Sequence, residues 1–291
     1  MKRIEFLKKT IITGVAAMAT PFVLKAKSDS KSTYDKLLNR VGFNHIPNEE
    51  IVGVHSVLHK ANTRSSEDHG WLKVNHTFSF ANYHNPNRMN FGVLRVLNDD
   101  TIAGGKGFRT HPHDNMEIIT IPLEGDLEHK DSMGNGAIIK NGDVQVMSAG
   151  TGITHSEFNA NKDKAVKVLQ IWLFPSQKNV TPRYDQLSLS SIETKNSFYQ
   201  LLSPNKNDQG VWIHQNAWFS IGNFDTDKKL DYKLKSKSNG VYAFIIEGQA
   251  IIGKQLLDKR DGFGIWNADK LNISASKGSK ILLMEVPMII S

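Results

Sequence analysis

Two short pairs of metal-binding residue types, His111 with His113 and His155 with Glu157, lie in sequence made of short apolar runs broken by glycine. Within each pair one residue separates the two members. On an extended strand this spacing places both side chains on the same face. Two such strands facing each other would bring three imidazoles and one carboxylate together. The sequence therefore predicts a β-structure organised around a metal site.

Imidazole nitrogens and a carboxylate oxygen suit a first-row transition metal, whereas magnesium and calcium prefer shells made of oxygen. Three histidines and a glutamate also exceed the three protein ligands usual in hydrolytic zinc sites. We therefore expect one metal ion, with Fe(II) favoured and Cu, Ni, Mn or Zn as alternatives. An isolated His-x-His pair also occurs in solvent-facing turns, but Gly150 and Gly152 allow a sharp turn that presents His155 and Glu157 inward.

The composition and the remaining motifs exclude several other chemistries. The chain of 291 residues contains no cysteine, which excludes disulfides, cysteine–zinc sites and a thiol nucleophile. It also lacks a G-x-S-x-G elbow, a P-loop and a dinucleotide-binding fingerprint that opens a helix. The glycine-rich residues 104–107 precede His111, and we interpret them as a tight loop that leads into the site.

Residues 1–26 have the features of an export signal. A basic start is followed by a moderately apolar stretch over residues 11–24, and Ala26 offers a small residue for cleavage. Residues 2–8 (KRIEFLK) resemble a twin-arginine signal with lysine in place of the first arginine. We expect export to the periplasm by this route or the Sec route, with a cytoplasmic location as the alternative. The apolar stretch contains too many threonines, with glycine and proline, for a good spanning helix, so no stable membrane span is expected after processing.

The positive charge of the chain resides mostly in this segment. Five basic residues and one glutamate among residues 1–26 carry +4 of the net charge of +7, which leaves +3 for residues 27–291. That remainder has no cluster of lysine and arginine interleaved with aromatic residues. We therefore expect no nucleic-acid partner, and we expect a monomer.

The mature chain is predicted to be all-β. Residues 27–48 are polar and form a predicted linker, and from Val52 onward no window shows a long helical stripe of apolar residues. Residues 132–136 (SMGNG) give a strong turn signal between two strands. Candidate strands cover residues 91–97, 117–123, 143–147 and 168–174.

The chain contains an internal duplication. Residues 123–126 (LEGD) recur as 246–249 (IEGQ), and residues 141–143 (NGD) recur as 261–263 (DGF). This pattern predicts two small barrels, the first over residues 49–178 and the second over 179–291. In the first half, the four candidate ligands lie at fixed distances along the sequence from Gly125 and Gly142. The same distances counted from Gly248 and Gly262 in the second half reach no residue of a metal-binding type. Those four positions are Leu234, Ser236, Ala275 and Lys277.

Further residues are candidates for the surroundings of the site. Glu117 follows His113 by an even spacing, so it is predicted on the same strand face, as a hydrogen-bonding neighbour of the ligands or as a fifth ligand. Four apolar residues are pocket candidates, with core packing as the alternative for each: Phe108, Met116, Met147 and Trp172. The remaining histidines named here are expected to be structural or exposed: His55, His59, His69, His76, His129 and His214.

The motifs around the ligands resemble the pirin family of the cupin superfamily. Residues 107–113 (GFRTHPH), continuing through Met116, Glu117 and Ile118, resemble the first cupin motif in its pirin form. Residues 142–157 (GDVQVMSAGTGITHSE) resemble the second. Residues 76–80 (HTFSF) and 169–172 (LQIW) match as well. The similarity covers roughly residues 52–289 and is greatest to bacterial quercetinase-like pirins.

This resemblance implies a bicupin, with two jelly-roll-type β-barrels and a metal site in the N-terminal barrel only. It implies iron held by His111, His113, His155 and Glu157, and a quercetin 2,3-dioxygenase activity that opens a flavonol with O2 and releases carbon monoxide. Glu157 would then also act as the general base. Two alternatives remain: a non-enzymatic metal or redox sensor that binds a partner protein, and a cupin that uses its metal as a Lewis acid on another small molecule.

Overall fold

The computed structural model describes residues 53–290, so the predicted signal segment and linker lie outside the described residues. The described chain consists of strands and two short 3-10 helices, η1 (Ala61–Thr63) and η2 (Leu189–Ser191). Across residues 53–290, no helix has both the length and the apolar character needed to cross a bilayer. The prediction of an all-β bicupin is confirmed.

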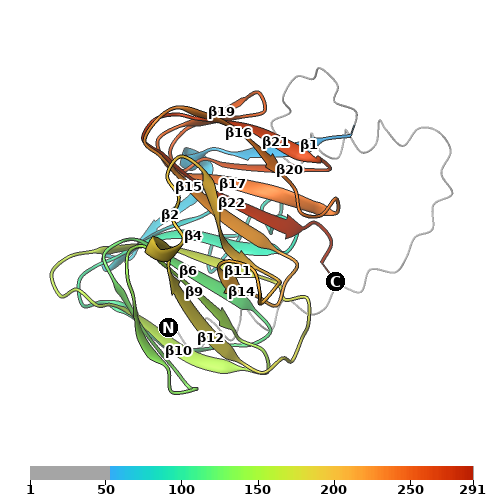
Figure 1. The fold of residues 1–291 in the computed structure, drawn as a ribbon. Helices are drawn as coiled ribbons and strands as arrows, with labels where there is room; N and C mark the ends of the chain where they lie inside the picture. Colours follow the sequence, from blue (N-terminus) through green and yellow to red (C-terminus); the bar gives the residue numbers. More distant parts are fainter. Residues whose placement is uncertain (1–52, 291) are drawn as a thin grey trace.

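The N-terminal barrel consists of a seven-stranded sheet and a four-stranded sheet (Figure 1). The large sheet has the order β12 (Arg183–Ser188), β9 (Asp143–Ser148), β6 (Glu117–Glu124), β11 (Val166–Leu173), β4 (Leu94–Ile102), β3 (Leu72–His76) and β2 (Ser65–Asp68). The small sheet has the order β5 (Gly107–His113), β10 (Ile153–Asn159), β7 (Leu127–Asp131) and β8 (Gly136–Ile139). The small sheet carries all four predicted ligands.

The C-terminal barrel repeats this strand order with one difference at the far edge of its large sheet, where the last strand is parallel to its neighbour and not antiparallel as in the N-terminal barrel. Its large sheet has the order β1 (His55–His59), β20 (Gly262–Trp266), β17 (Asn239–Glu247), β22 (Ser279–Pro287), β15 (Trp218–Phe224), β13 (Phe198–Ser203) and β14 (Val211–Trp212). Its small sheet has the order β16 (Lys228–Lys233), β21 (Lys270–Ala275), β18 (Ala250–Ile252) and β19 (Gln255–Leu257). The internal duplication seen in the sequence is therefore a duplication of sheet order.

One edge strand of each large sheet comes from the other half of the chain. β1 precedes the N-terminal barrel in sequence but pairs with β20, and β12 follows the predicted boundary at residue 178 but pairs with β9. Figure 1 shows the blue β1 among the orange and red strands of the C-terminal barrel. The structural division thus departs from a single cut between residues 178 and 179. The two crossed strands tie the barrels together.

The two large sheets pack face to face, and the main hydrophobic cluster lies between them. Odd-numbered residues of β6, such as Ile119 and Ile121, belong to this interface, as do Ile221 and Leu282 of the C-terminal barrel. The even-numbered residues of β6 therefore face the interior of the N-terminal barrel, because side chains alternate along a strand. The small sheets lie on the outer sides of this pair of large sheets.

The interiors of the two barrels differ. The C-terminal barrel is filled by one continuous apolar cluster. In the N-terminal barrel two smaller apolar clusters occur instead, one around Leu72 and Ile102 and one around Ile118 and Met147. Buried polar side chains lie in this barrel as well: Thr120, His129, Gln145, His155, Glu157 and Gln170.

Strand register identifies the C-terminal counterparts of the ligands. Leu127 and Ala250 each follow a positive-φ glycine by two residues and pair with Asn159 and Ala275, respectively. β21 therefore corresponds to β10, and its partner β16 corresponds to β5, the partner of β10. The positions in and directly after β16, and in β21, that match the four ligands hold apolar or aromatic residues of the C-terminal cluster. Those counterparts of His111, His113, His155 and Glu157 are Tyr232, Leu234, Leu271 and Ile273.

Among residues 53–290, the groups of histidine and acidic side chains close enough to hold a metal ion lie in the N-terminal barrel. The individual counterparts predicted from sequence offsets were wrong, by two residues for the first pair and by four for the second. The offsets were counted from the repeated glycines, and the two halves use different numbers of residues between these glycines and the strands that follow or precede them.

Candidate metal centre

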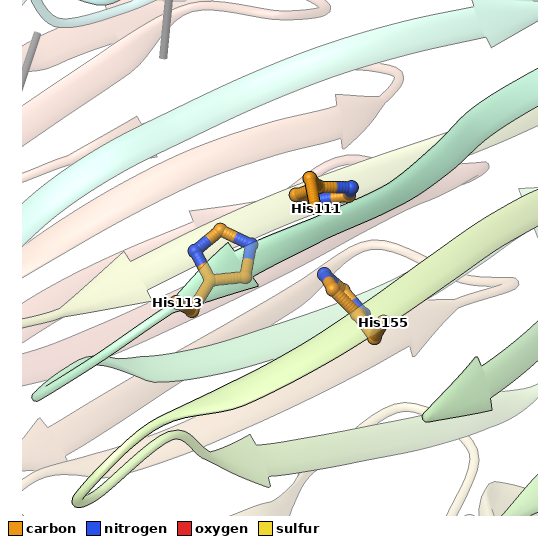
Figure 2. A group of neighbouring side chains, drawn as sticks. All are labelled: His111, His113 and His155. Carbon is orange, nitrogen blue, oxygen red and sulfur yellow. The ribbon is translucent and has the colours of Figure 1, made fainter. Parts of the chain in front are cut away.

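Three of the predicted ligands meet between β5 and β10. The strands are antiparallel, with His155 opposite His111 and Ile153 opposite His113. Ring centroids lie 4.5 Å apart for His111 and His155, and 4.9 Å apart for His113 and His155. Figure 2 shows one ring nitrogen of His155 directed toward the space between the other two rings. One ligand atom from each of the three histidines lies within 4.8 Å of the others.

The protonation of these rings suits metal binding. Burial, followed by the neighbouring histidines, lowers the pKa of His113 and of His155 to about 2, so both rings are neutral in the physiological range. The Nδ1 of His111 lies 2.7 Å from the carbonyl oxygen of Arg109, to which it donates, and this tautomer leaves Nε2 as a ligand atom. Both nitrogens of His155 are buried without a hydrogen-bond partner. A metal ion would satisfy one of these atoms, so the residues fit such an ion.

Glu157 adjoins this cluster through His155. Its side chain is buried, and the Nε2 of Gln170 donates to both carboxylate oxygens, at 3.0 and 2.9 Å. Thr120 Oγ1 donates to the same carboxylate at 3.3 Å. Glu157 shares a group of close ligand atoms with His129 and His155, but not with His111 and His113. The structure thus brings the three predicted histidines together and places the predicted glutamate beside them, within reach of Gln170.

A tight backbone turn sets the entry of β10 into the site. Gly150 has φ +48°, and a Cβ at this position would lie 1.9 Å from the carbonyl oxygen of Val180. Gly152 has φ +134°, a conformation open only to glycine at low cost. The two glycines are required as the sequence predicts, and at Gly150 the reason is a close backbone approach.

Glu117 does not lie on the strand face of His113. β5 ends at His113 and β6 begins at Glu117, in different sheets, so the even spacing that assumed one strand was misleading. Its fully buried carboxylate accepts hydrogen bonds from Ser148 Oγ at 2.8 Å and from the backbone N–H of His214 at 3.3 Å. Burial raises the pKa of Glu117 to about 7. No close metal-ligand group of the described chain includes Glu117.

The pocket candidates separate into two groups. Met116 and Trp172 pack against the apolar cluster that contains Met147, and the Trp172 ring meets His113 edge to face at 4.8 Å. Trp172 therefore adjoins His113, and Met116 and Met147 belong to the apolar cluster beside it. Phe108 instead packs against Trp71 at 5.4 Å and lies 6.5 Å from the His111 ring.

His129 lies beside the site, although the sequence predicted a structural or exposed position for it. This residue is completely buried on β7, its ring centroid lies 5.3 Å from that of His155, and its Nε2 lies 3.2 Å from Asp131 Oδ2. His129 and Asp131 have the same one-residue separation as the two ligand pairs, and this spacing was the signal available in the sequence. Of the other histidines, His59 contacts the Tyr242 hydroxyl and His76 contacts Asn98, as expected for structural residues.

Two family models and several known proteins match this chain. The family model described as Pirin matches residues 54–173, and the one described as the quercetinase C-terminal cupin domain matches residues 200–286. A quercetin 2,3-dioxygenase of Escherichia coli K12 is 40% identical over 230 residues, which cover 79% of this chain and 98% of the relative. The chain belongs to the pirin family.

Other relatives agree with this assignment. A putative quercetin 2,3-dioxygenase of Pseudomonas aeruginosa is 38% identical over 222 residues, covering 75% of this chain and 94% of the relative. The crystal structure of a bacterial pirin of E. coli in complex with nickel(II) superposes with a TM-score of 0.76 at 38% identity, covering 81% of this chain and 100% of that one. The predicted resemblance to quercetin 2,3-dioxygenase-like pirins is confirmed by these relatives.

Proposed function

We propose that this pirin is an iron-dependent dioxygenase that cleaves flavonols such as quercetin at the 2,3 bond with O2 and releases carbon monoxide. The observation that carries the proposal is that His155 is buried and neither of its ring nitrogens has a hydrogen-bond partner. His111 and His113 lie beside it, and each offers a nitrogen that could bind the same metal ion. The names of relatives up to 40% identical support the substrate class. The nickel complex of a related pirin supports one transition metal, and iron is our choice because the reaction uses O2.

The side chains around the site suit the first steps of this chemistry. His111, His113, His155 and Glu157 would hold the iron, which supplies an open coordination position and a redox-active centre when it is bound. The carboxylate of Glu157 accepts the proton of the flavonol 3-hydroxyl, and the resulting oxyanion is the electron-rich form that reacts with O2. Gln170 and Thr120 orient that carboxylate through the hydrogen bonds described above.

The His113 side of the pocket suits a flat aromatic substrate. The Trp172 ring stands edge to face against His113, and Phe80 stands edge to face against Trp172 at 5.2 Å. Met116 and Met147 belong to the same apolar cluster as Trp172, and we expect this apolar wall to keep water from the oxyanion. A polyphenol that entered here would place its rings against this wall and its hydroxyl groups toward the histidines.

The test is an anaerobic reconstitution of residues 27–291 with Fe(II), followed by quercetin and then O2. Quercetin absorbance, oxygen uptake and carbon monoxide release are followed together. His111→Ala should abolish turnover, because His111 is a predicted ligand. His69→Ala is the matched control, because His69 is half-exposed and pairs with Glu67 away from the site.

We expect one carbon monoxide for each O2 consumed in the wild type and the control variant. A metal-loaded protein that consumes no O2 with quercetin would refute the proposed reaction. Turnover of a candidate substrate without O2 would instead indicate Lewis-acid chemistry, and a partner captured only in one metal state would indicate a sensor. Reconstitution with Ni(II), Mn(II), Cu(II) or Zn(II) in parallel identifies the active metal.

We also propose that the protein acts outside the cytoplasm as a monomer. The export proposal rests on residues 1–26, which precede the family match at residue 54. Fractionation of cells that express the full chain should place the processed form in the periplasm. Replacement of both Lys2 and Arg3 by glutamine should retain the precursor in the cytoplasm if the twin-arginine-like motif directs export.

A further inference from the structure

The pair His129 and Asp131 flanks the metal centre on the side opposite the His-Pro-His strand. In the small sheet β10 lies between β5 and β7, so its side chains have neighbours on both sides. Across to β7, Glu157 lies opposite His129 and His155 lies opposite Asp131. Directly paired residues of antiparallel strands project on the same face of the sheet. All four side chains therefore enter the barrel interior together.

Asp131 is held rigidly by the turn that follows β7. Its carboxylate accepts hydrogen bonds from the backbone N–H groups of Met133 at 2.9 Å and Asn135 at 3.0 Å, and from Asn135 Nδ2 at 2.8 Å. The fourth contact is His129 Nε2 at 3.2 Å. Since an ionised carboxylate only accepts, His129 Nε2 must carry the proton.

In the neutral imidazole, this leaves the other ring nitrogen of His129, Nδ1, as an acceptor. It is buried, and it has no hydrogen-bond partner. The Tyr184 ring covers His129 at a centroid distance of 4.7 Å, while its hydroxyl donates to Gln186 at 2.7 Å. The Nδ1 of His129 is therefore an unpaired hydrogen-bond acceptor in the interior of the barrel.

His155 requires a hydrogen-bond acceptor for the ring nitrogen that does not bind the metal ion. A histidine that binds a metal through one nitrogen carries a proton on the other, and that N–H almost always has a specific acceptor. Two imidazoles joined by an in-line hydrogen bond have centroids about 5 Å apart, because a bond of about 3 Å adds to the two ring radii. The centroids of His129 and His155 are 5.3 Å apart, a separation compatible with such a hydrogen bond.

We propose that His129 is the positioning residue of the metal centre: its Nδ1 accepts the N–H of His155, and Asp131 fixes the tautomer that makes this possible. The proposal rests on the metal site of the proposed function, but not on its substrate or its reaction. The C-terminal barrel offers an internal comparison. There the counterpart of His155 is Leu271 and that of His129 is Ile252, so the ligand and its acceptor are absent together.

The test measures metal affinity without substrate or oxygen. Ni(II) is competed between the full chain and a chromophoric chelator at fixed pH, and the thermal unfolding of each metal-free variant is recorded separately. His129→Leu should weaken Ni(II) binding about 10–100-fold, whereas His129→Asn, whose amide oxygen occupies the region of Nδ1, should retain affinity within about threefold of wild type. Tyr184→Phe is the matched control, because it keeps the ring against His129.

Asp131→Asn is a second variant in case His129→Leu does not fold. Its amide group donates to His129 Nε2, which moves the ring proton to Nδ1 and removes the acceptor, so affinity should fall as in His129→Leu. Wild-type affinity in both His129→Leu and Asp131→Asn would overturn the proposal. Equal losses in His129→Leu and His129→Asn would also overturn it. Loss of one nitrogen coupling from the Cu(II) electron paramagnetic resonance spectrum of His129→Leu would overturn it in favour of direct ligation.

Discussion

Glu157→Gln separates metal binding from proton transfer at this site. The three histidines that meet between β5 and β10 are untouched by this change, so most of the metal should be retained. The variant keeps the size of the side chain but removes its charge and its basicity. We expect turnover to fall 100- to 10,000-fold, the range typical of a lost general base, which is about 3–5 kcal/mol in activation free energy.

The neighbours of Glu157 limit the effect of this change on folding. Gln170 donates to both carboxylate oxygens, and Thr120 Oγ1 lies 3.3 Å from Glu157 and 3.2 Å from Gln170 Oε1. If the Gln170 amide rotates by 180°, its oxygen accepts from the new amide and its nitrogen donates to Thr120. Two bonds to a charged group become bonds between neutral groups, at a cost of about 1–2 kcal/mol in the free energy of unfolding.

The assay compares iron content, quercetin turnover at saturating substrate, and thermal unfolding. Glu128→Gln is the matched control, because Glu128 precedes His129 on β7 but is half-exposed and pairs with Lys130. Wild-type turnover in an iron-loaded Glu157→Gln protein would refute the assignment of Glu157 as the base. Loss of iron together with turnover would show instead that Glu157 is needed as a ligand.

Three further changes test the surroundings of the site. Gly150→Ala should lower the free energy of unfolding by about 3 kcal/mol or more, because the new Cβ meets a backbone carbonyl. Gly142→Ala is the control: it has φ +92° and open space around it, so it should cost only about 1–2 kcal/mol. Equal costs of the two changes in denaturant unfolding would contradict this explanation. Glu117→Gln should stabilise the protein by up to about 3 kcal/mol at pH 8 but not at pH 5. The pKa of Glu117 is about 7 in the folded protein and 4.5 in the unfolded chain, so the stability of the wild type falls as the pH rises from 4.5 to 7. A pH-independent effect would oppose this. The metal-free protein should lose about 1 kcal/mol for each of His113 and His155 between pH 6.5 and 5.5, because the unfolded rings protonate near 6.5 while the folded pKa is about 2. His113→Asn should reduce that slope in thermal unfolding, and an unchanged slope would exclude His113 as a cause.

The sequence by itself determined the strand class, the duplication and the three histidines that meet. This was possible because strand periodicity is local: two residues separated by one position share a face wherever the strand lies. The same rule could have been applied to His129 and Asp131, which have the same separation, but the sequence was not interpreted in this way. It failed for Glu117, because an even count has no meaning once the chain turns between β5 and β6 and enters another sheet.

Only the tertiary structure decided which strands are neighbours. The exchange of β1 and β12 between barrels, the counterparts Leu271 and Ile273, and the approach of His129 to His155 all depend on pairing between segments distant in sequence. Loop and strand lengths set this pairing, and they differ between the two halves. The burial that lowers the pKa of His113 and His155 likewise comes from the packing of whole sheets, whose contributions no short motif contains.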